Sequence, residues 1–162
     1  MSQAGQIDGL QFARDRGRRS GHLKLDSLPR LADMGCKAAR ADYVIEGGHN
    51  AEQRSCLRID IDGVLELLCQ RCLGPVEHIV EVRSELELAT DPHLIESADD
   101  DIDRVLATRS MDPVALVEDE LILALPMVPM HEGCANANAT ELNKPSPFAV
   151  LAALKKTGNP ES

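Results

Sequence analysis

A hydrophobic helix with clear start and stop signals lies in the stretch DPVALVEDELILALPMVPMHEGC, residues 112–134. Asp112 can cap its N-terminus through a side-chain oxygen, and Pro113 suits the first turn, where its missing N–H costs nothing. Pro126 ends the helix because it lacks an N–H, and Pro129 keeps the following chain extended. The apolar residues that recur on one face of the 3.6-residue repeat are Val114, Val117, Leu121 and Leu125. A helix this apolar must pack against another element, most simply the face of a sheet.

Alternating apolar and polar residues predict the strands of that sheet. The predicted strands lie near residues 38–46, 54–68 and 73–89. Gly47-Gly48 is expected to close the first strand, and Asp62-Gly63 is expected to form a turn or a bulge. The fold class is therefore α+β: a bent antiparallel sheet or small open barrel packed by one main helix, with flexible N-terminal and C-terminal segments.

Three further segments are predicted outside this sheet and helix. A short helix is expected from Asp26 to Gly35, with Asp26 or Ser27 as its cap. The first residues, up to about residue 20, are polar and expected to be mobile. The acidic run Asp99, Asp100, Asp101 and Asp103 within residues 90–104 predicts a solvated, flexible loop, because like charges repel each other. We expect a single α+β domain over residues 1–134.

The remaining segment, residues 135–162, is predicted to be a disordered linker followed by a short amphipathic helix. The linker is poor in apolar residues, and Pro147 marks a helix start. Such a helix usually docks on its own domain or on a partner. The residues expected to dock are Phe148, Leu151 and Leu154.

Composition narrows the cellular setting and the class of protein. The chain has 162 residues, five cysteines and only 2% aromatic residues. No signal peptide or membrane-spanning stretch is visible, so a cytoplasmic protein with reduced thiols is expected. So few aromatic residues argue against a surface on which exposed bases stack.

A Cys-x-x-Cys turn and a His-x-x-Cys pair together suggest a metal site. Cys69 and Cys72 lie between two predicted strands, and His131 and Cys134 follow the main helix. Zn²⁺ prefers four nitrogen or sulfur ligands in a tetrahedron, and these four residues supply them. Two other interpretations remain open: Cys69 is a buried hydrophobic thiol and Cys72 a turn residue, or the pair is a redox dithiol.

The N-terminal quarter is basic although the whole chain carries a net charge of −10. Residues 1–40 hold eight Lys or Arg residues against four Asp residues. The densest cluster is Arg14, Arg16, Arg18 and Arg19. These arginines are candidates for contact with nucleic acid or with an acidic partner, and a solvated arm explains them equally well.

No catalytic constellation is visible, so the sequence predicts no enzymatic activity. A nucleophile elbow, a phosphate-binding glycine loop and a metalloprotease helix are all missing from the sequence. The histidines outside the metal candidate are scattered and suggest no general base.

Three separated blocks resemble the bacterial large ribosomal RNA subunit accumulation proteins, the YceD-type family. They cover about a third of the chain and read LLCQRCLGPVEHIVEV, DPVALVEDELILALPMVPMHEGC and KPSPFAVLAALKK. The resemblance implies a cytoplasmic, non-enzymatic factor needed for synthesis, processing or stability of 23S ribosomal RNA, hence for large-subunit assembly. In some relatives the segment after the helix carries several cysteines resembling a zinc ribbon, whereas this chain has Cys134 with His131 there.

Three hypotheses describe how such a protein could act. In the first, the protein contacts ribosomal RNA through its basic N-terminal segment. In the second, it is a protein-only adaptor whose acidic body holds a basic ribosomal protein. The third is a metal-binding accessory of an enzyme.

Overall fold

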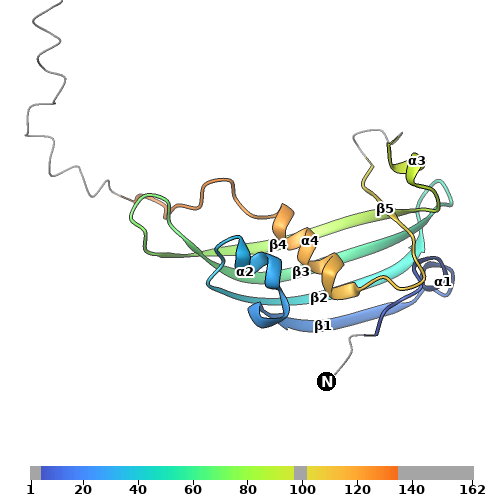
Figure 1. Cartoon of the computed structure of the whole chain (residues 1–162), viewed down its shortest axis with the longest axis horizontal. Coiled ribbons are helices and arrows are strands. Elements are labelled where there is room, and N and C mark those ends of the chain that lie inside the picture. Colours follow the sequence, from blue (N-terminus) through green and yellow to red (C-terminus); the bar gives the residue numbers. More distant parts are fainter. Residues whose placement is uncertain (1–4, 97–101, 135–162) are drawn as a thin grey trace, which may run out of the picture.

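Five strands form one open sheet in the order of the sequence (Figure 1). They are β1 (Arg18–Lys24), β2 (Ala38–His49), β3 (Ser55–Leu68), β4 (Pro75–Ala89) and β5 (Arg104–Leu106). The helices are α1 (Gly9–Arg14), α2 (Pro29–Asp33), α3 (Pro92–Glu96) and α4 (Pro113–Leu123), with a 3-10 turn at Leu25–Ser27. This computed structural model describes residues 5–96 and 102–134, so the expected linker and docking helix of residues 135–162 lie outside the described residues.

The predicted α+β class is confirmed, and the sheet is open rather than a closed barrel. Neighbouring strands from β1 to β4 run antiparallel, whereas β5 pairs with β4 in parallel. This parallel strand was not expected, because residues 90–104 were predicted to be a flexible loop. Helix α3 and the start of β5 occupy the two ends of that segment. Three residues are too few to show an alternating pattern, so β5 could not be recognised from the sequence.

The core lies between one face of the sheet and the helices α2 and α4 (Figure 1). Burial alternates along β2, as expected for a sheet with one packed and one solvated face. Aliphatic residues make up nearly all of this core, in keeping with the low aromatic content. Its largest fully buried side chains include Leu28, Leu31, Ile45, Leu57, Ile59, Ile61, Leu65, Val117 and Leu121.

Helix α4 begins as predicted and also caps a second helix. The Asp112 side chain accepts a hydrogen bond of 2.9 Å from the N–H of Val114. Glu118 of α4 is buried and points at the N-terminus of α2. Its Oε1 accepts from the backbone N–H groups of Arg30 (2.8 Å) and Leu31 (3.1 Å). The Glu118 carboxylate of α4 therefore caps α2, whereas the predicted caps Asp26 and Ser27 do not.

Gly47, predicted at a turn, and Gly63, predicted at a turn or a bulge, both lie within regularly paired strands. Gly47 belongs to β2, and a Cβ there would come within 2.4 Å of the Phe12 carbonyl oxygen in α1. Gly63 belongs to β3, where a Cβ would come within 2.6 Å of the Arg40 carbonyl oxygen. Close approach of a neighbouring backbone, rather than chain reversal, requires these glycines. The reversal between β2 and β3 falls at residues 50–54.

The expectation of a loose N-terminal arm is wrong from residue 9 onward. Residues 9–24 form α1 and β1, and the Asp8 side chain caps α1 by accepting from the N–H of Gln11. Strand β1 buries only Leu23, so its sequence lacks a clear alternation. Within the described residues, no helix has the length and apolar content needed to cross a membrane.

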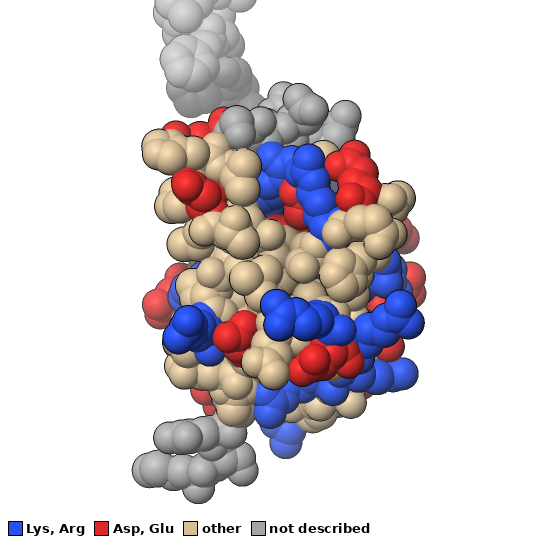
Figure 2. Space-filling view, turned by 90° about the vertical axis from the view of Figure 1, so that its right-hand side faces the viewer, with Lys and Arg blue, Asp and Glu red and all other residues tan. Residues whose placement is uncertain are grey.

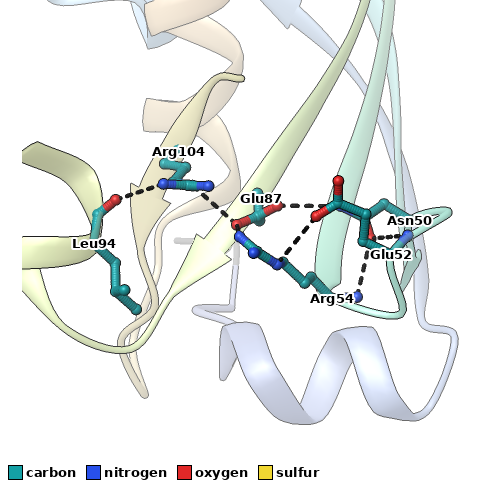
Figure 3. A network of polar contacts seen from close by, with 6 residues as sticks. All are labelled: Asn50, Glu52, Arg54, Glu87, Leu94 and Arg104. Carbon is teal, nitrogen blue, oxygen red and sulfur yellow. Dashed lines mark hydrogen bonds and ion pairs between the residues drawn. The ribbon is translucent and has the colours of Figure 1, made fainter. Parts of the chain in front are cut away.

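A buried carboxylate holds β5 and the turn between β2 and β3 to the end of β4 (Figure 3). Glu87 Oε1 accepts from Arg104 Nε at 2.9 Å and from an Arg54 guanidinium N–H at 2.8 Å. Its other oxygen accepts from Asn50 Nδ2 at 3.2 Å. Glu87 thus joins three separate segments of the chain.

Candidate metal centre and basic residues

Three cysteines and one histidine meet at the tip of the β3–β4 hairpin. One ligand atom from each of Cys69, Cys72, His131 and Cys134 lies within 4.8 Å of the other three. The Cys69 and Cys134 sulfurs are 3.9 Å apart, and Cys72 Sγ lies 3.4 Å from His131 Nδ1. Zinc bonds of about 2.0–2.3 Å place ligand atoms about 3.5 Å apart in a tetrahedron. The geometry therefore suits a tetrahedral Cys3His site, hereafter the Cys3His cluster.

A tight turn positions the two cysteines of the hairpin. Cys69 directly follows β3, and its N–H donates to the Gly74 carbonyl at 2.8 Å. The Leu73 N–H donates back to the Cys69 carbonyl at 2.9 Å, with Leu73 in the left-handed region at φ 58°. Pro75 then starts β4. This turn brings Cys72 back over Cys69 on the same side of the hairpin.

Hydrogen bonds dock the segment after α4 against this turn. The Gln70 N–H donates to the Pro129 carbonyl at 2.9 Å, and within the docked segment the Cys134 N–H donates to the His131 carbonyl at 3.2 Å. His131 Nε2 lies 2.7 Å from the Pro75 carbonyl oxygen, to which its N–H donates in the matching tautomer. That tautomer leaves Nδ1 with a lone pair facing Cys72, the arrangement that orients metal-binding histidines.

The surroundings of Cys69 favour its thiolate. The backbone N–H of Cys72 points at its sulfur, and together with those of Arg71 and His131 it outweighs burial and lowers the pKa of Cys69 to about 5. Burial, followed by the neighbouring cysteines, raises the pKa of Cys134 to about 11. A metal ion binds thiolates, so a cluster with one thiolate already favoured is suited to a cation.

The other two cysteines lie away from this cluster. Cys36 and Cys56 are buried, and burial is the main cause that raises the pKa of each thiol. They are small core side chains.

The four candidate arginines lie on structured elements and do not form one cluster. Arg14 ends α1, Arg16 lies in the following turn, and Arg18 and Arg19 begin β1. Successive strand residues point to opposite faces of a sheet, so Arg18 and Arg19 diverge. Arg18 pairs with Glu46 at 3.3 Å, whereas the Arg19 guanidinium donates to the Gly5 carbonyl.

A pocket brings two of these arginines together with one that the sequence analysis missed. Arg16 and Arg18 line it with Arg58 of β3. In the end view of Figure 2, Lys and Arg side chains gather in the lower half of the described surface, with acidic side chains among them. Arg58 belongs to no local motif, and its partners become visible only through the pairing of β1, β2 and β3.

The fold and the cluster define a small α+β protein with a candidate Cys3His metal centre. A family model described as large ribosomal RNA subunit accumulation protein YceD matches residues 57–155, and the chain belongs to this family. A similar protein is the large ribosomal RNA subunit accumulation protein YceD of Haemophilus influenzae. It is 28% identical over 172 residues, which cover 93% of this chain and 94% of that protein. No solved structure matches the chain.

The family assignment confirms the resemblance seen in the three sequence blocks. The matched residues include Cys69, Cys72, His131 and Cys134 as well as the whole of α4. The basic residues of α1 and β1 lie before the match begins.

Proposed function

We propose that this protein is a cytoplasmic, non-enzymatic ribosome-biogenesis factor. It supports synthesis, processing or stability of 23S ribosomal RNA and thereby large-subunit assembly. The observation that carries the proposal is the match to the YceD family over residues 57–155, together with the name of the Haemophilus influenzae relative. The candidate contacts with ribosomal RNA stay Arg14, Arg16, Arg18 and Arg19. Of these, Arg16 and Arg18 share a pocket with Arg58 and so supply the clustered cations that phosphate binding needs.

A protein-only adaptor is the second candidate function. The outer face of the sheet exposes Asp42, Asp60 and Asp62, whose side chains are more than half exposed, and Arg83 pairs with the last two. Together with the net charge of −10, this face suits a basic ribosomal protein. The expected docking residues Phe148, Leu151 and Leu154 stay a prediction for either partner.

Cells that lack the protein should accumulate less 23S ribosomal RNA and fewer large subunits, measured by RNA quantification and gradient sedimentation. Normal amounts of both would contradict the proposal. Ultraviolet cross-linking in cells then separates the two candidates. Recovery of 23S ribosomal RNA supports direct contact, whereas recovery of a ribosomal protein without RNA supports the adaptor.

We further propose that the Cys3His cluster binds one zinc ion. Zinc would tie the hairpin tip at Cys69 and Cys72 to the segment that leaves α4, which carries His131 and Cys134. Thiolate and imidazole ligands suit Zn²⁺ better than the hard cations that prefer oxygen. The ion would be structural, because four protein ligands leave no open position for a substrate.

Protein purified without chelator should contain about one equivalent of zinc per chain, measured by elemental analysis. Cys134→Ser should lose most of this metal, because three remaining ligands bind far more weakly. Cys36→Ser is the matched control: its sulfur donates to the Ala38 carbonyl, a bond that a serine hydroxyl can retain. Only trace zinc in the wild type, or equal loss in both variants, would contradict a site at this cluster.

A further inference from the structure

A pocket of about 470 Å³ opens at the end of the sheet where β1 begins and β2 ends. Its lining includes three arginines from different elements and the last residues of β2. The residues that matter here are Arg16, Arg18, Glu46, Gly48, His49 and Arg58. The pocket lies at the opposite end of β3 from Cys69, so it is separate from the Cys3His cluster.

The pocket is positive although the chain as a whole is acidic. Its lining contains three guanidinium groups and the carboxylate of Glu46, and Glu85 beside it pairs with Arg58, so one positive charge remains in excess within a chain of net charge −10. The side chains of Arg18 and Arg58 are 67% and 50% exposed, so their remaining donors face solvent. A guanidinium has five N–H donors, more than these ion pairs use.

Neighbouring groups hold two of the arginines in place. Arg58 Nε lies 2.9 Å from Glu85 Oε2, and its terminal N–H donates to the His49 carbonyl at 3.2 Å. Its other terminal nitrogen lies 3.5 Å from the position that a Cβ of Gly48 would occupy. Arg18 pairs with Glu46 at 3.3 Å on the neighbouring strand. Arginines fixed in this way lose less freedom when they bind a ligand.

Arg16 occupies a backbone position that does not favour arginine. Its φ of 50° lies in the left-handed region, where glycine and asparagine are preferred at the end of a helix. The turn after α1 is closed by the N–H of Gly17, which donates to the Phe12 carbonyl at 2.8 Å. The fold would therefore be served at least as well by glycine or asparagine, and the exposed guanidinium needs another explanation.

We propose that this pocket binds a phosphate group of an RNA backbone. Guanidinium groups recognise phosphate oxygens with paired, charge-assisted hydrogen bonds, and Arg16, Arg18 and Arg58 can converge on one such group. The chain has only 2% Phe, Tyr and Trp, and none of them lines this pocket, whereas three arginines do, so we expect the contact to be mainly with the backbone and not with a base. The choice of RNA as the source of the phosphate rests on the proposed function.

The binding test uses fluorescence anisotropy of a labelled single-stranded RNA titrated with the full-length protein at several salt concentrations. Arg16→Asn should weaken binding about threefold or more at low salt and reduce the salt slope by about 0.7, the value of one lost phosphate contact. Its melting temperature should not fall, because asparagine suits the left-handed region. Arg16→Asn combined with Arg18→Gln should weaken binding about tenfold.

Arg83→Gln is the matched control for net charge. Arg83 lies on the same sheet but outside the pocket, is 54% exposed and pairs with Asp62. Arg83→Gln removes the same charge as Arg16→Asn. If both variants lose the same affinity for RNA, a general charge effect explains the loss and the proposal is overturned. Titration with inorganic phosphate, followed through the NMR amide signals of Gly47 and Gly48, distinguishes binding of a free phosphate ion from binding of an RNA backbone phosphate. Phosphate binding without RNA binding would overturn the RNA assignment.

A cellular experiment separates failure of this pocket from failure of the proposed function. The wild-type gene should restore 23S ribosomal RNA in cells that lack the protein, and the Arg16→Asn, Arg18→Gln double variant should restore less. Full restoration by the double variant would overturn the proposal that this pocket binds RNA phosphate, while leaving the ribosomal role intact. Normal 23S ribosomal RNA in the deletion strain would contradict the ribosomal role whatever the pocket binds in vitro.

Discussion

Leu121→Asp is expected to unfold the domain rather than to remove one particular activity. Leu121 is fully buried in α4, within the core between this helix and the sheet. An unpaired carboxylate in an apolar interface costs several kcal/mol, a large part of the whole stability of a domain, which is about 5–15 kcal/mol. Thermal unfolding followed by circular dichroism should show a lost or strongly lowered transition.

Leu123→Asp is the matched control on the same helix. Leu123 is 78% exposed, so the same substitution two residues away should cost less than about 1 kcal/mol, including its interaction with the helix dipole. A Leu121→Asp variant that melts at the wild-type temperature would show that α4 is not part of the core.

The long strands and the main helix were predictable because their patterns are strong. In β3, Leu57, Ile59 and Ile61 are fully buried, as their alternation with charged residues predicts. The capping of α4 by Asp112 was equally readable, since it depends on neighbours in sequence.

Features that depend on contacts distant in sequence were not predictable. Glu118 looks like an ordinary acidic residue in the middle of a helix, and only the packing of α4 against α2 turns it into a cap. Gly47 looks like a turn residue until α1 is seen to approach it. Short elements such as α1 and β5 have too few residues for their period to stand out.

The Cys3His cluster and the basic pocket also differ in how far the sequence alone predicts them. Ligand spacing within each half of the Cys3His cluster is local, so the sequence suggested all four residues, and the fold brings the halves together. The basic pocket has no local motif. Arg58 joins Arg16 and Arg18 only because β1, β2 and β3 pair in a register that places Arg18, Glu46 and Arg58 side by side.

Glu87→Gln is expected to cause the second large loss of stability. Glu87 is 6% exposed, and the side chain of its partner Arg104 is 9% exposed, so their ion pair is buried (Figure 3). Removing one charge leaves Arg104 without a compensating carboxylate, and breaking a buried pair in this way typically costs about 3–5 kcal/mol. Because glutamine keeps the shape and one acceptor, a loss of about 3 kcal/mol is expected, measured by chemical denaturation at neutral pH.

Glu85→Gln is the matched control, because Glu85 lies on the same strand and pairs with Arg58 at the surface, where both side chains are about half exposed. This substitution should cost less than about 1 kcal/mol.

Burial favours a higher pKa for Glu87, but hydrogen bonds and charges from Arg54 and Arg104 outweigh it, so the pKa is lowered from its ordinary 4.5. The stabilisation is therefore present above pH 4.5 and is lost as the pH falls through the lowered pKa. The difference between the wild type and Glu87→Gln should shrink over that acidic range. A difference independent of pH would show that shape, not charge, holds β5 and the β2–β3 turn in place.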